Sequence, residues 1–256
     1  MFKSISNWLE YQKDTFGNST AFDQNDLDII YKNFSELNTV ESQSSENMSS
    51  KDIIVNDFNY KKNAKTIAQD WYNSNNLMEL NNSIKNCMEC PLGDTRTNFV
   101  FGSGNPNADI MIIGEAPGAD EDEQGLPFVG RAGQLLTNML EAIQIKREEV
   151  YIANIIKCRP PNNRRPTTVE INECEPYLYK QIELIKPKLI LVLGLTAVSS
   201  LLKKEYKMSE IRGTIIDFRG AKLLITYHPA ALLRNPNWKK PAWEDLKLLK
   251  QMYDKL

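Results

Sequence analysis

The sequence predicts a three-layer α/β/α fold with a mostly parallel central sheet of about four strands. Short, apolar stretches rich in β-branched residues alternate along the chain with longer stretches of helical periodicity. This alternation is typical of a parallel sheet with helices on both faces. Polar and glycine-rich segments follow the apolar stretches directly, as expected where loops leave the carboxyl ends of parallel strands and form ligand sites.

Each predicted element follows from its own pattern. Strands are expected at residues 110–113, 150–156, 189–193 and 222–226, because these runs are short and apolar enough to be buried on both faces. Helices are expected at 77–86, 133–143, 168–185, 197–203 and 242–256. Residues 214–218 and 222–225 flank Arg219 and Gly220, which predicts an antiparallel hairpin at the end of the sheet.

The first 76 residues predict a polar, acidic extension that precedes the α/β domain at 77–256. Residues 2–13 and 26–37 have the pattern of amphipathic helices, and residues 39–52 are rich in Ser, Glu and Asn with little to bury. We interpret 39–52 as a disordered linker. A replication or repair protein that binds through residues 1–76 has no positive signal in the sequence.

Composition limits the compartment and the partners. No apolar segment approaches the roughly 18 residues of a membrane span, and the N-terminus lacks the order of a signal peptide. We therefore expect a cytoplasmic protein with no membrane partner. The net charge is −2, but residues 1–80 carry 7 Lys/Arg against 12 Asp/Glu, which leaves 24 against 21 for the rest. The half with the motifs is mildly basic, so local patches can bind phosphates.

The chain is organised around residues 109–136, where an apolar run ends in a glycine-rich, acidic loop. Glu115 stands at the predicted strand exit, where burial and neighbours can tune a carboxylate as a base. Phe128 is a large aromatic on a loop between Pro127 and Gly130, outside any helical or strand period. An ordinary strand-to-helix turn is the alternative, and these two residues argue for a functional loop.

The four cysteines are predicted to hold a metal. Cys87 and Cys90 form a CxxC followed by proline, and Cys158 and Cys174 lie far downstream. Four thiolates with no nearby histidine suit tetrahedral zinc or an iron–sulfur cluster, and the spacing does not separate the two. Independent buried cysteines are the alternative, and a redox role has no candidate substrate partner. We assign the metal a structural role.

Two further predicted strands end in polar side chains. Asn154 is a carboxamide inside an apolar strand; it can read the edge of a base or act as a hydrogen-bonded core residue. His228, the only histidine, follows the strand at 222–226. A lone histidine is more often structural, but Glu115, Asn154 and His228 would all converge on one edge of a parallel sheet.

Basic residues accompany both segments. Arg164 and Arg165 lie in a proline-stiffened loop that suits phosphate contacts, although a merely solvated loop is as common. Arg234, Lys239 and Lys240 surround Trp238, and basic residues interleaved with an aromatic would form a strand-contacting loop.

From about residue 77 to the C-terminus, the chain resembles the family 4 uracil-DNA glycosylases, which carry a 4Fe-4S cluster. The resemblance covers roughly 70 per cent of the length and rests on GEAPGADEDEQGLPFVGRAG, NIIKCRPPNNRRPT, ECEPYL, HPAALLR and the spacing of the four cysteines. It implies a uracil-DNA glycosylase-like catalytic domain at 77–256. It also selects a structural iron–sulfur cluster on Cys87, Cys90, Cys158 and Cys174 over zinc.

The resemblance implies a role for each residue at the strand exits. An enzyme that cleaves a base from DNA must flip the base out of the stack and bind its polar edge and its face. Phe128 would stack on uracil, and Asn154 would pair with N3–H and O4. His228 would donate a hydrogen bond to O2, where negative charge collects as the bond breaks. Glu115 would position or deprotonate the attacking water.

Further roles come from the same resemblance. Backbone groups of Gly114 and Ala116 would line the uracil pocket, and Glu121 would lie near C5 and help to exclude the methyl group of thymine. Glu115, Asp120 and Glu121 could share the activation of water. DNA contacts are expected at Arg131, Arg164, Arg165 and Arg234. A related subfamily bonds covalently to the abasic sugar through a histidine that residues 158–168 lack, so we expect turnover.

The sequence therefore predicts a monomeric enzyme that acts on uracil-containing DNA in base-excision repair. One rival is a non-catalytic iron–sulfur module that binds nucleic acid, tied to replication. A weaker rival is a zinc-stabilised hydrolase of small nucleotides.

Overall fold

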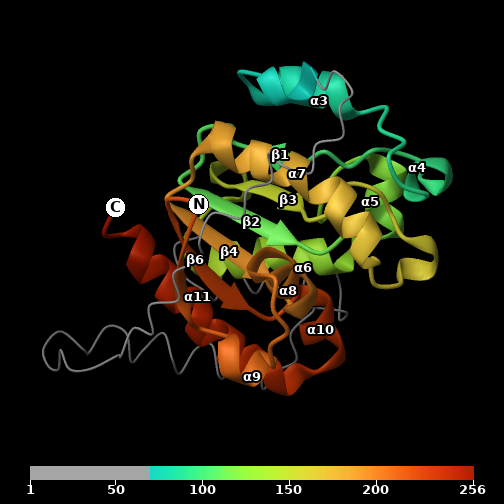
Figure 1. Cartoon of the computed structure of the whole chain (residues 1–256). Helices are drawn as coiled ribbons and strands as arrows, with labels where there is room; N and C mark the ends of the chain where they lie inside the picture. The colour runs from blue at the N-terminus through green and yellow to red at the C-terminus, as the bar shows by residue number, and fades with distance from the viewer. Residues whose placement is uncertain (1–69) are drawn as a thin grey trace, which may run out of the picture. The chain divides into compact units, whose positions relative to one another are not determined.

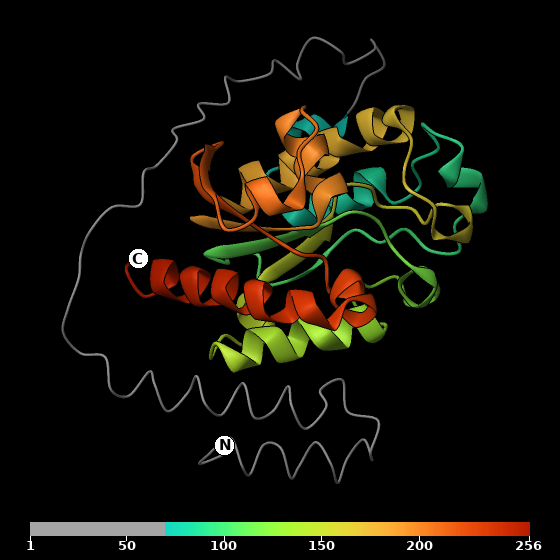
Figure 2. The same cartoon turned by 90° about the horizontal axis from the view of Figure 1, so that it is seen from below.

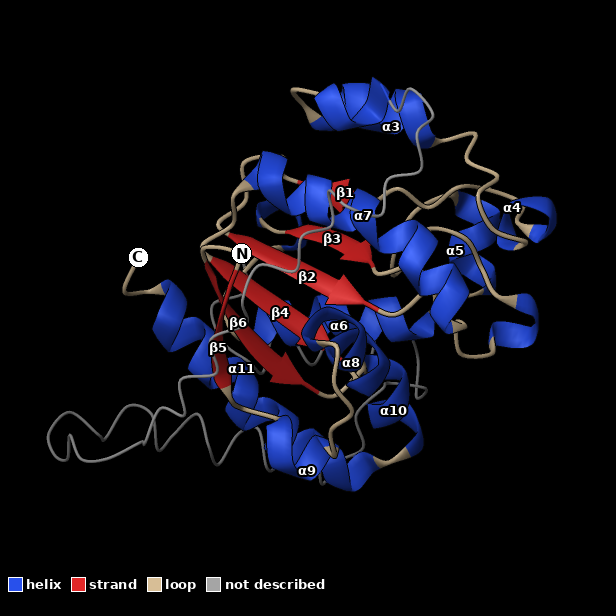
Figure 3. Ribbon diagram, in the orientation of Figure 1, coloured by secondary structure: helices blue, strands red, loops and turns tan. Residues whose placement is uncertain are grey.

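Within the part of the chain that the structure describes, a single twisted sheet of six strands forms the central layer (Figures 1 and 3). The structure is a computed structural model, and it describes residues 70–256. The strands are β1 (Ser103–Gly104), β2 (Ile110–Gly114), β3 (Tyr151–Asn154), β4 (Leu189–Leu193), β5 (Ile215–Phe218) and β6 (Ala221–Thr226). They lie in the order β1-β3-β2-β4-β6-β5. The inner four are parallel, and each edge strand is antiparallel to its neighbour.

Helices cover both faces of this sheet. The longer ones are α3 (Leu77–Ile84), α6 (Arg131–Ala142), α7 (Thr168–Ile185), α8 (Leu195–Leu202) and α11 (Lys239–Tyr253). Short helices are α4 (Leu92–Thr95), α5 (Ala119–Gln124), α9 (Met208–Ile211) and α10 (Pro229–Arg234). Short 3-10 turns are η2 (Asp70–Asn73), η3 (Arg147–Glu149), η4 (Pro161–Asn163) and η5 (Pro236–Trp238). Figure 2 shows α6 and α11 on one face, with α7 and α8 on the other.

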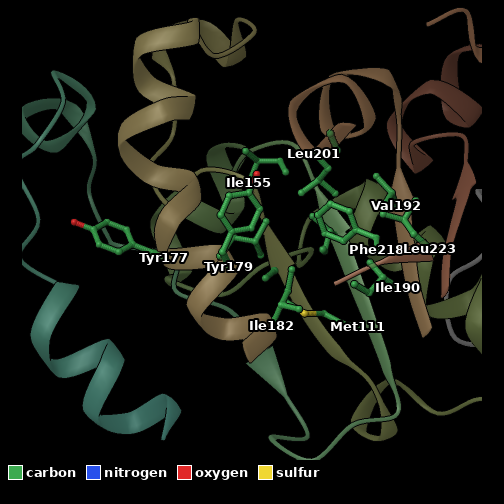
Figure 4. Close-up of a cluster of buried hydrophobic side chains, with 14 of the residues drawn as sticks. Met111, Ile155, Tyr177, Tyr179, Ile182, Ile190, Val192, Leu201, Phe218 and Leu223 are labelled. Atoms are coloured by element: carbon green, nitrogen blue, oxygen red, sulfur yellow. The ribbon is translucent and has the colours of Figure 1, made fainter. Parts of the chain in front are cut away.

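One large hydrophobic cluster lies between the sheet and α7, and buried apolar residues of α6 and α11 cover the other face. All residues of β2, β3 and β4 are buried, as expected for strands covered on both faces. Figure 4 shows Met111, Ile190 and Val192 of the sheet packed beside Ile182 and Tyr179 of α7. The parallel strands are therefore held in place by their packing against α7.

The predicted α/β/α fold is confirmed. The four expected strands are the four parallel strands β2, β3, β4 and β6. The predicted hairpin forms β5 and β6, and it turns at Arg219 and Gly220, whose φ angles of 49° and 83° are both positive. The helix predicted at 168–185 is α7, which begins after the capping residue Thr167.

Other boundaries moved by a few residues, and one strand was missed. The predicted strand at 150–156 is shorter, because β3 ends at Asn154. The sheet gains β1, whose two residues are too few to form a pattern in the sequence. The predicted helices at 2–13 and 26–37 and the linker at 39–52 lie outside the described residues. No helix within residues 70–256 has the length and apolar character needed to cross a membrane.

Candidate functional site

Three segments that are far apart in the sequence meet where the parallel strands end. Gly114, the last residue of β2, is in register with Asn154, the last residue of β3. His228 follows β6 by two residues, and Gly194 follows β4 by one. A Cβ added to Gly194 would lie 3.0 Å from Cβ of His228, so β4 and β6 deliver these two residues to the same place.

The Asn154 side chain is buried without satisfying its hydrogen-bonding capacity. The residue is 2% exposed, and its Oδ1 has no hydrogen-bond partner. Buried polar atoms in folded proteins are nearly always paired, because an unpaired one costs about 1–3 kcal/mol. The hydrogen-bonded core asparagine that the sequence allowed is therefore not what the structure contains. An acceptor in this position is suited to a donor on a ligand.

Phe128 lies against the paired ends of β2 and β3 and against His228, which follows β6. A Cβ added to Gly114 would come within 2.7 Å of the Phe128 ring and would collide with Asn154 Oδ1. The Phe128 and His228 rings have centroids 5.5 Å apart and are tilted by 32°. Gly114, Phe128, Asn154 and His228 thus form one cluster, hereafter the strand-end cluster. The glycine is required there, because any side chain would displace the ring or the amide.

The backbone at Phe128 is strained. Its φ is +54°, in the left-handed region that large side chains rarely adopt. Such a conformation costs of order 1–3 kcal/mol and persists only where the surroundings hold it. Here, an added Cβ on Gly133 of α6 would collide with the Phe128 carbonyl group, so the loop backbone packs directly on the helix.

Hydrogen bonds fix the loop that carries Phe128. Oε1 of Glu121 accepts from the N–H groups of Val129 and Gly130, at 2.9 and 3.0 Å, and Oε2 accepts from Gly118 N–H at 3.0 Å. Arg147 donates to the Pro127 carbonyl at 2.7 Å. Glu121 and Arg147 therefore fix the backbone of the loop that carries the Phe128 ring. Sequence reasoning missed Arg147 because its partner lies 20 residues away.

His228 has a defined proton arrangement. Its Nδ1 accepts a hydrogen bond from the Ala230 N–H at 3.1 Å and thereby caps the N-terminus of helix α10. Burial, assisted by the positive charge of Arg234, lowers the pKa of His228 to about 4. The neutral imidazole with an acceptor Nδ1 carries its proton on Nε2, which makes Nε2 a donor.

Glu115 and Ala116 continue directly from the cluster. The Glu115 carbonyl accepts from Ile156 N–H at 3.2 Å and the Gly114 carbonyl accepts from Ile155 N–H at 2.9 Å, so β2 and β3 stay paired past their ends. Both Glu115 and Ala116 are partly exposed. Asp120 is exposed, and its carboxylate would collide with a Cβ on Gly130.

The four predicted DNA-binding arginines are all exposed, but they are not equivalent. Arg131 is the first residue of α6, and Arg234 is the last residue of α10. Arg164 pairs with the buried carboxylate of Glu170 through Nη1 and Nη2, at 2.9 and 2.6 Å. That pair lowers the pKa of Glu170 to about 2. Arg165 shares the same loop, with its carbonyl bonded to Arg164.

The cysteines gather beyond the carboxyl end of β3, where Cys158 follows Asn154 by four residues and Cys174 lies on α7. Cys158 and Cys174 are buried, and Cys87 and Cys90 are partly exposed. Arg96 connects the pairs, since its Nη1 lies 2.6 Å from the Cys87 carbonyl and 3.4 Å from Cys158 Sγ. Tyr177 donates to Cys87 Sγ at 3.3 Å, and Lys157 N–H donates to Cys174 Sγ at 3.2 Å. We call Cys87, Cys90, Cys158 and Cys174 the cysteine cluster.

Within residues 70–256, no three His, Cys, Asp or Glu side chains are arranged to hold a metal ion. The donor set of the cysteine cluster is four sulfurs and no histidine, which suits zinc and an iron–sulfur cluster alike.

Lys157 links the two clusters. It is fully buried, and its Nζ donates to the Asn154 carbonyl at 2.9 Å and to Gln181 Oε1 at 2.7 Å. Gln181 in turn donates to the Phe101 carbonyl at 2.9 Å. Burial lowers the pKa of Lys157 to about 8. Sequence reasoning missed this residue, because lysine is almost never fully buried.

The fold and the strand-end cluster define an α/β protein with polar and aromatic side chains gathered at the carboxyl ends of its parallel strands. The family profile described as the Uracil DNA glycosylase superfamily matches residues 101–247, which is more than half of the chain. The chain therefore belongs to the uracil DNA glycosylase superfamily.

Known relatives place the chain more closely. The type-4 uracil-DNA glycosylase of Pyrobaculum aerophilum is 46% identical over 178 residues, which are 66% of this chain and 91% of the relative. That of Thermotoga maritima is 48% identical over 167 residues, 64% of this chain and 87% of the relative. A type-5 uracil-DNA glycosylase of P. aerophilum is 28% identical over 148 residues, 50% of this chain and 64% of the relative. Within the superfamily, the chain belongs to the type-4 uracil-DNA glycosylases.

Proposed function

We propose that the protein releases uracil from DNA by hydrolysing the bond between uracil N1 and the sugar C1′. The product is an abasic site, which begins base-excision repair of deaminated cytosine. One observation carries the proposal: a buried acceptor, Asn154 Oδ1, has no partner beside the Phe128 ring. The similarity to type-4 uracil-DNA glycosylases supports the same activity.

Asn154 would read the base. Its Oδ1 would accept from uracil N3–H, and its amide would donate to O4. Cytosine has an unprotonated N3 and an amino group at position 4, so it would leave both groups of the buried amide without partners. A site built around such a pair rejects the wrong base strongly, because buried polar groups are then left unpaired.

Phe128 would stack on the face of the flipped base. A flipped base has lost its neighbours in the DNA, and an aromatic ring replaces part of that stacking. The strain at Phe128 supports this role, since strained backbone is concentrated at ligand sites. Gly114 and Ala116 would border the base with backbone atoms. The placement of Glu121 beside C5 stays a prediction, and its three bonds to the Phe128 loop support a positioning role.

His228 and Glu115 would carry the chemistry. As the C1′–N1 bond breaks, its electron pair leaves with uracil, and negative charge develops on O2. Nε2–H of the neutral His228 would donate to that oxygen. Water would attack C1′ and lose a proton to Glu115, so that the new C–O bond replaces the C–N bond. Asp120 and Glu121 remain alternatives to Glu115 for holding this water.

We propose that the cysteine cluster holds a 4Fe-4S cluster, as the resemblance implies. Each of the four thiolates would bind a different iron, which spreads the ligands further apart than around a single ion. The donors from Arg96, Tyr177 and Lys157 N–H to three of the sulfurs support this, since hydrogen bonds to cluster sulfurs are typical. The group would supply a cross-link between the segment before β1 and α7.

The DNA backbone would bind at exposed arginines around the strand-end cluster. Arg131 and Arg234 begin and end helices α6 and α10, which contact each other. Arg165 is exposed in the loop before α7. Arg164 can contact phosphate only while its charge is shared with Glu170, so we expect it to contribute least.

A cleavage assay tests the proposed function. The protein is incubated with a labelled oligonucleotide that contains one uracil, and alkali then cuts the abasic site. We expect one cut at the uracil position with the wild type, and a loss of at least 10²-fold in rate with Glu115→Gln. The control oligonucleotide carries thymine at that position. An uncut uracil strand would contradict the proposal and favour the non-catalytic binding module.

Absorbance tests the cluster. The purified protein should be brown, with a broad band near 400 nm, and Cys174→Ser should remove most of that band. A colourless protein with bound zinc would contradict the iron–sulfur proposal.

A further inference from the structure

Trp238 forms an exposed aromatic platform next to the strand-end cluster. Its ring is stacked on Tyr227, with centroids 5.1 Å apart and planes 21° from parallel. Trp238 is 40% exposed, and it is the only aromatic among the large exposed hydrophobic residues of the described chain. Tyr227 immediately precedes His228, so the platform adjoins the residue proposed to act on the flipped base.

The segment that carries Tyr227 and Trp238 is positively charged. Residues 227–243 contain Arg234, Lys239 and Lys240 and no Asp or Glu. The first two acidic residues after this segment are Glu244 and Asp245. Asp245 is 2% exposed and paired with Arg212. Glu244 is paired with Lys247. A polyanion that approaches Trp238 therefore meets basic side chains and acidic groups that are already neutralised.

Stacking geometry selects the ligand. Tyr227 stacks on one face of the indole and Trp238 is still 40% exposed, so part of the indole ring is open to a ligand. Bases inside a duplex stack on one another and offer no free face, whereas an unpaired base does. Exposed aromatics among basic residues are the usual means by which proteins bind single-stranded nucleic acid.

We propose that Trp238, supported by Tyr227, stacks on an unpaired base that flanks the target uracil in single-stranded DNA. This inference rests on the proposed function and extends it, because it assigns a second base-binding position and a preference for unpaired DNA. Tyr227 acts by fixing the plane of the indole. The platform contributes to binding and takes no part in breaking the glycosidic bond.

Binding of DNA without uracil tests the platform independently of catalysis. Fluorescence anisotropy measures the Kd of the full chain for a labelled 15-nucleotide thymidine strand, and for the same strand paired with its complement. Stacking on an aromatic is worth about 1–3 kcal/mol per base, so Trp238→Ala should weaken single-strand binding about 5- to 150-fold. Trp238→Phe should recover most of that loss, and duplex binding should change less than two-fold.

Two further readouts separate a platform from a packing role. Indole fluorescence should be quenched by the single strand in the wild type, and this quenching should be largely absent in Trp238→Phe. Ile215→Ala, at an exposed apolar residue of the edge strand β5, is the matched control and should leave every Kd unchanged. A Kd within two-fold of wild type for Trp238→Ala on the single strand would overturn the proposal. An equal loss on the duplex would also overturn it.

The cleavage assay distinguishes this failure from failure of the proposed function. With enzyme in saturating excess, Trp238→Ala should release uracil at the wild-type rate. If the wild type cuts uracil and Trp238→Ala binds single strands normally, only the platform is wrong. If the wild type cuts nothing, the proposed function is wrong whatever the binding shows.

Discussion

The two clusters at the ends of the segment 154–158 use polar groups in opposite ways. In the cysteine cluster, Arg96, Tyr177 and Lys157 N–H all donate to sulfur. In the strand-end cluster, Asn154 Oδ1 has no partner, and Phe128 holds a strained backbone. The cysteine cluster, whose sulfurs accept hydrogen bonds from the protein itself, stabilises the fold. The strand-end cluster, whose buried acceptor is unpaired, is suited to bind a ligand.

This difference predicts that Asn154 matters for activity and not for stability. Asn154→Ala should lower the rate of uracil release at least 10³-fold, because both hydrogen bonds to the base are lost. Its free energy of unfolding should fall by less than about 1 kcal/mol, since the substitution also removes an unpaired buried oxygen. Single-turnover cleavage and thermal unfolding measure the two effects. A large loss of stability would return Asn154 to the structural role that the sequence allowed.

The link between the clusters is expected to matter for both properties. Lys157→Met leaves the Asn154 carbonyl and Gln181 Oε1 without their donor, which should cost about 2–4 kcal/mol of stability. Uracil release should also fall about tenfold, because Asn154 loses an anchor. The matched control is Lys222→Met, whose exposed ammonium pairs with the exposed Asp217 and which should cost under about 1 kcal/mol. Equal losses in the two variants would show that the hydrogen bonds of Lys157 contribute no more than an exposed ion pair.

A third substitution, Gly133→Ala, tests whether the position of the loop that carries Phe128 limits the rate of uracil release. Gly133→Ala should slow uracil release about 10- to 100-fold, because the added methyl group collides with the Phe128 carbonyl. Alanine would otherwise favour helix α6 by about 1 kcal/mol, so any loss reflects the collision. Ala132→Gly controls for helix propensity and should change the rate little. A Gly133→Ala variant with wild-type activity would show that the Phe128 ring does not need its present place.

The smallest effect concerns pH. The pKa of His228 falls from its ordinary value near 6.5 to about 4 in the folded protein. Between pH 6.5 and 4 the unfolded state binds a proton that the native state does not, so stability falls as pH falls, by up to about 1.4 kcal/mol per pH unit. His228→Asn removes this component. The unfolding free energy of the wild type minus that of His228→Asn should therefore fall from pH 7 to pH 4; a constant value would contradict a neutral imidazole in the native state.

The sequence was sufficient for the four parallel strands, for the terminal hairpin and for the meeting of Asn154 and His228, but not for the edge strand β1. Apolar runs identify buried parallel strands, and the carboxyl ends of such strands share one edge. Phe128 could be selected because it is a large aromatic between Pro127 and Gly130, outside any periodic pattern. The positive φ of Phe128 could not be predicted, because it depends on the packing of the loop against Gly133.

Residues that act through distant partners could not be predicted. Lys157 donates to Gln181, 24 residues away, and Arg147 donates to Pro127, 20 residues away, and no local pattern marks a lysine for burial. The pairing of Arg164 with Glu170 was also hidden, although it changes what this arginine can offer to DNA. Local patterns therefore find the groups that face a ligand, and tertiary structure is needed to find those that hold them.

A crystal structure of the protein with free uracil tests the central claim most directly. The account predicts the pyrimidine stacked on the Phe128 ring, with N3 within about 3 Å of Asn154 Oδ1 and O2 within hydrogen-bonding distance of His228 Nε2. Uracil bound elsewhere, with Asn154 Oδ1 still unpaired, would contradict it.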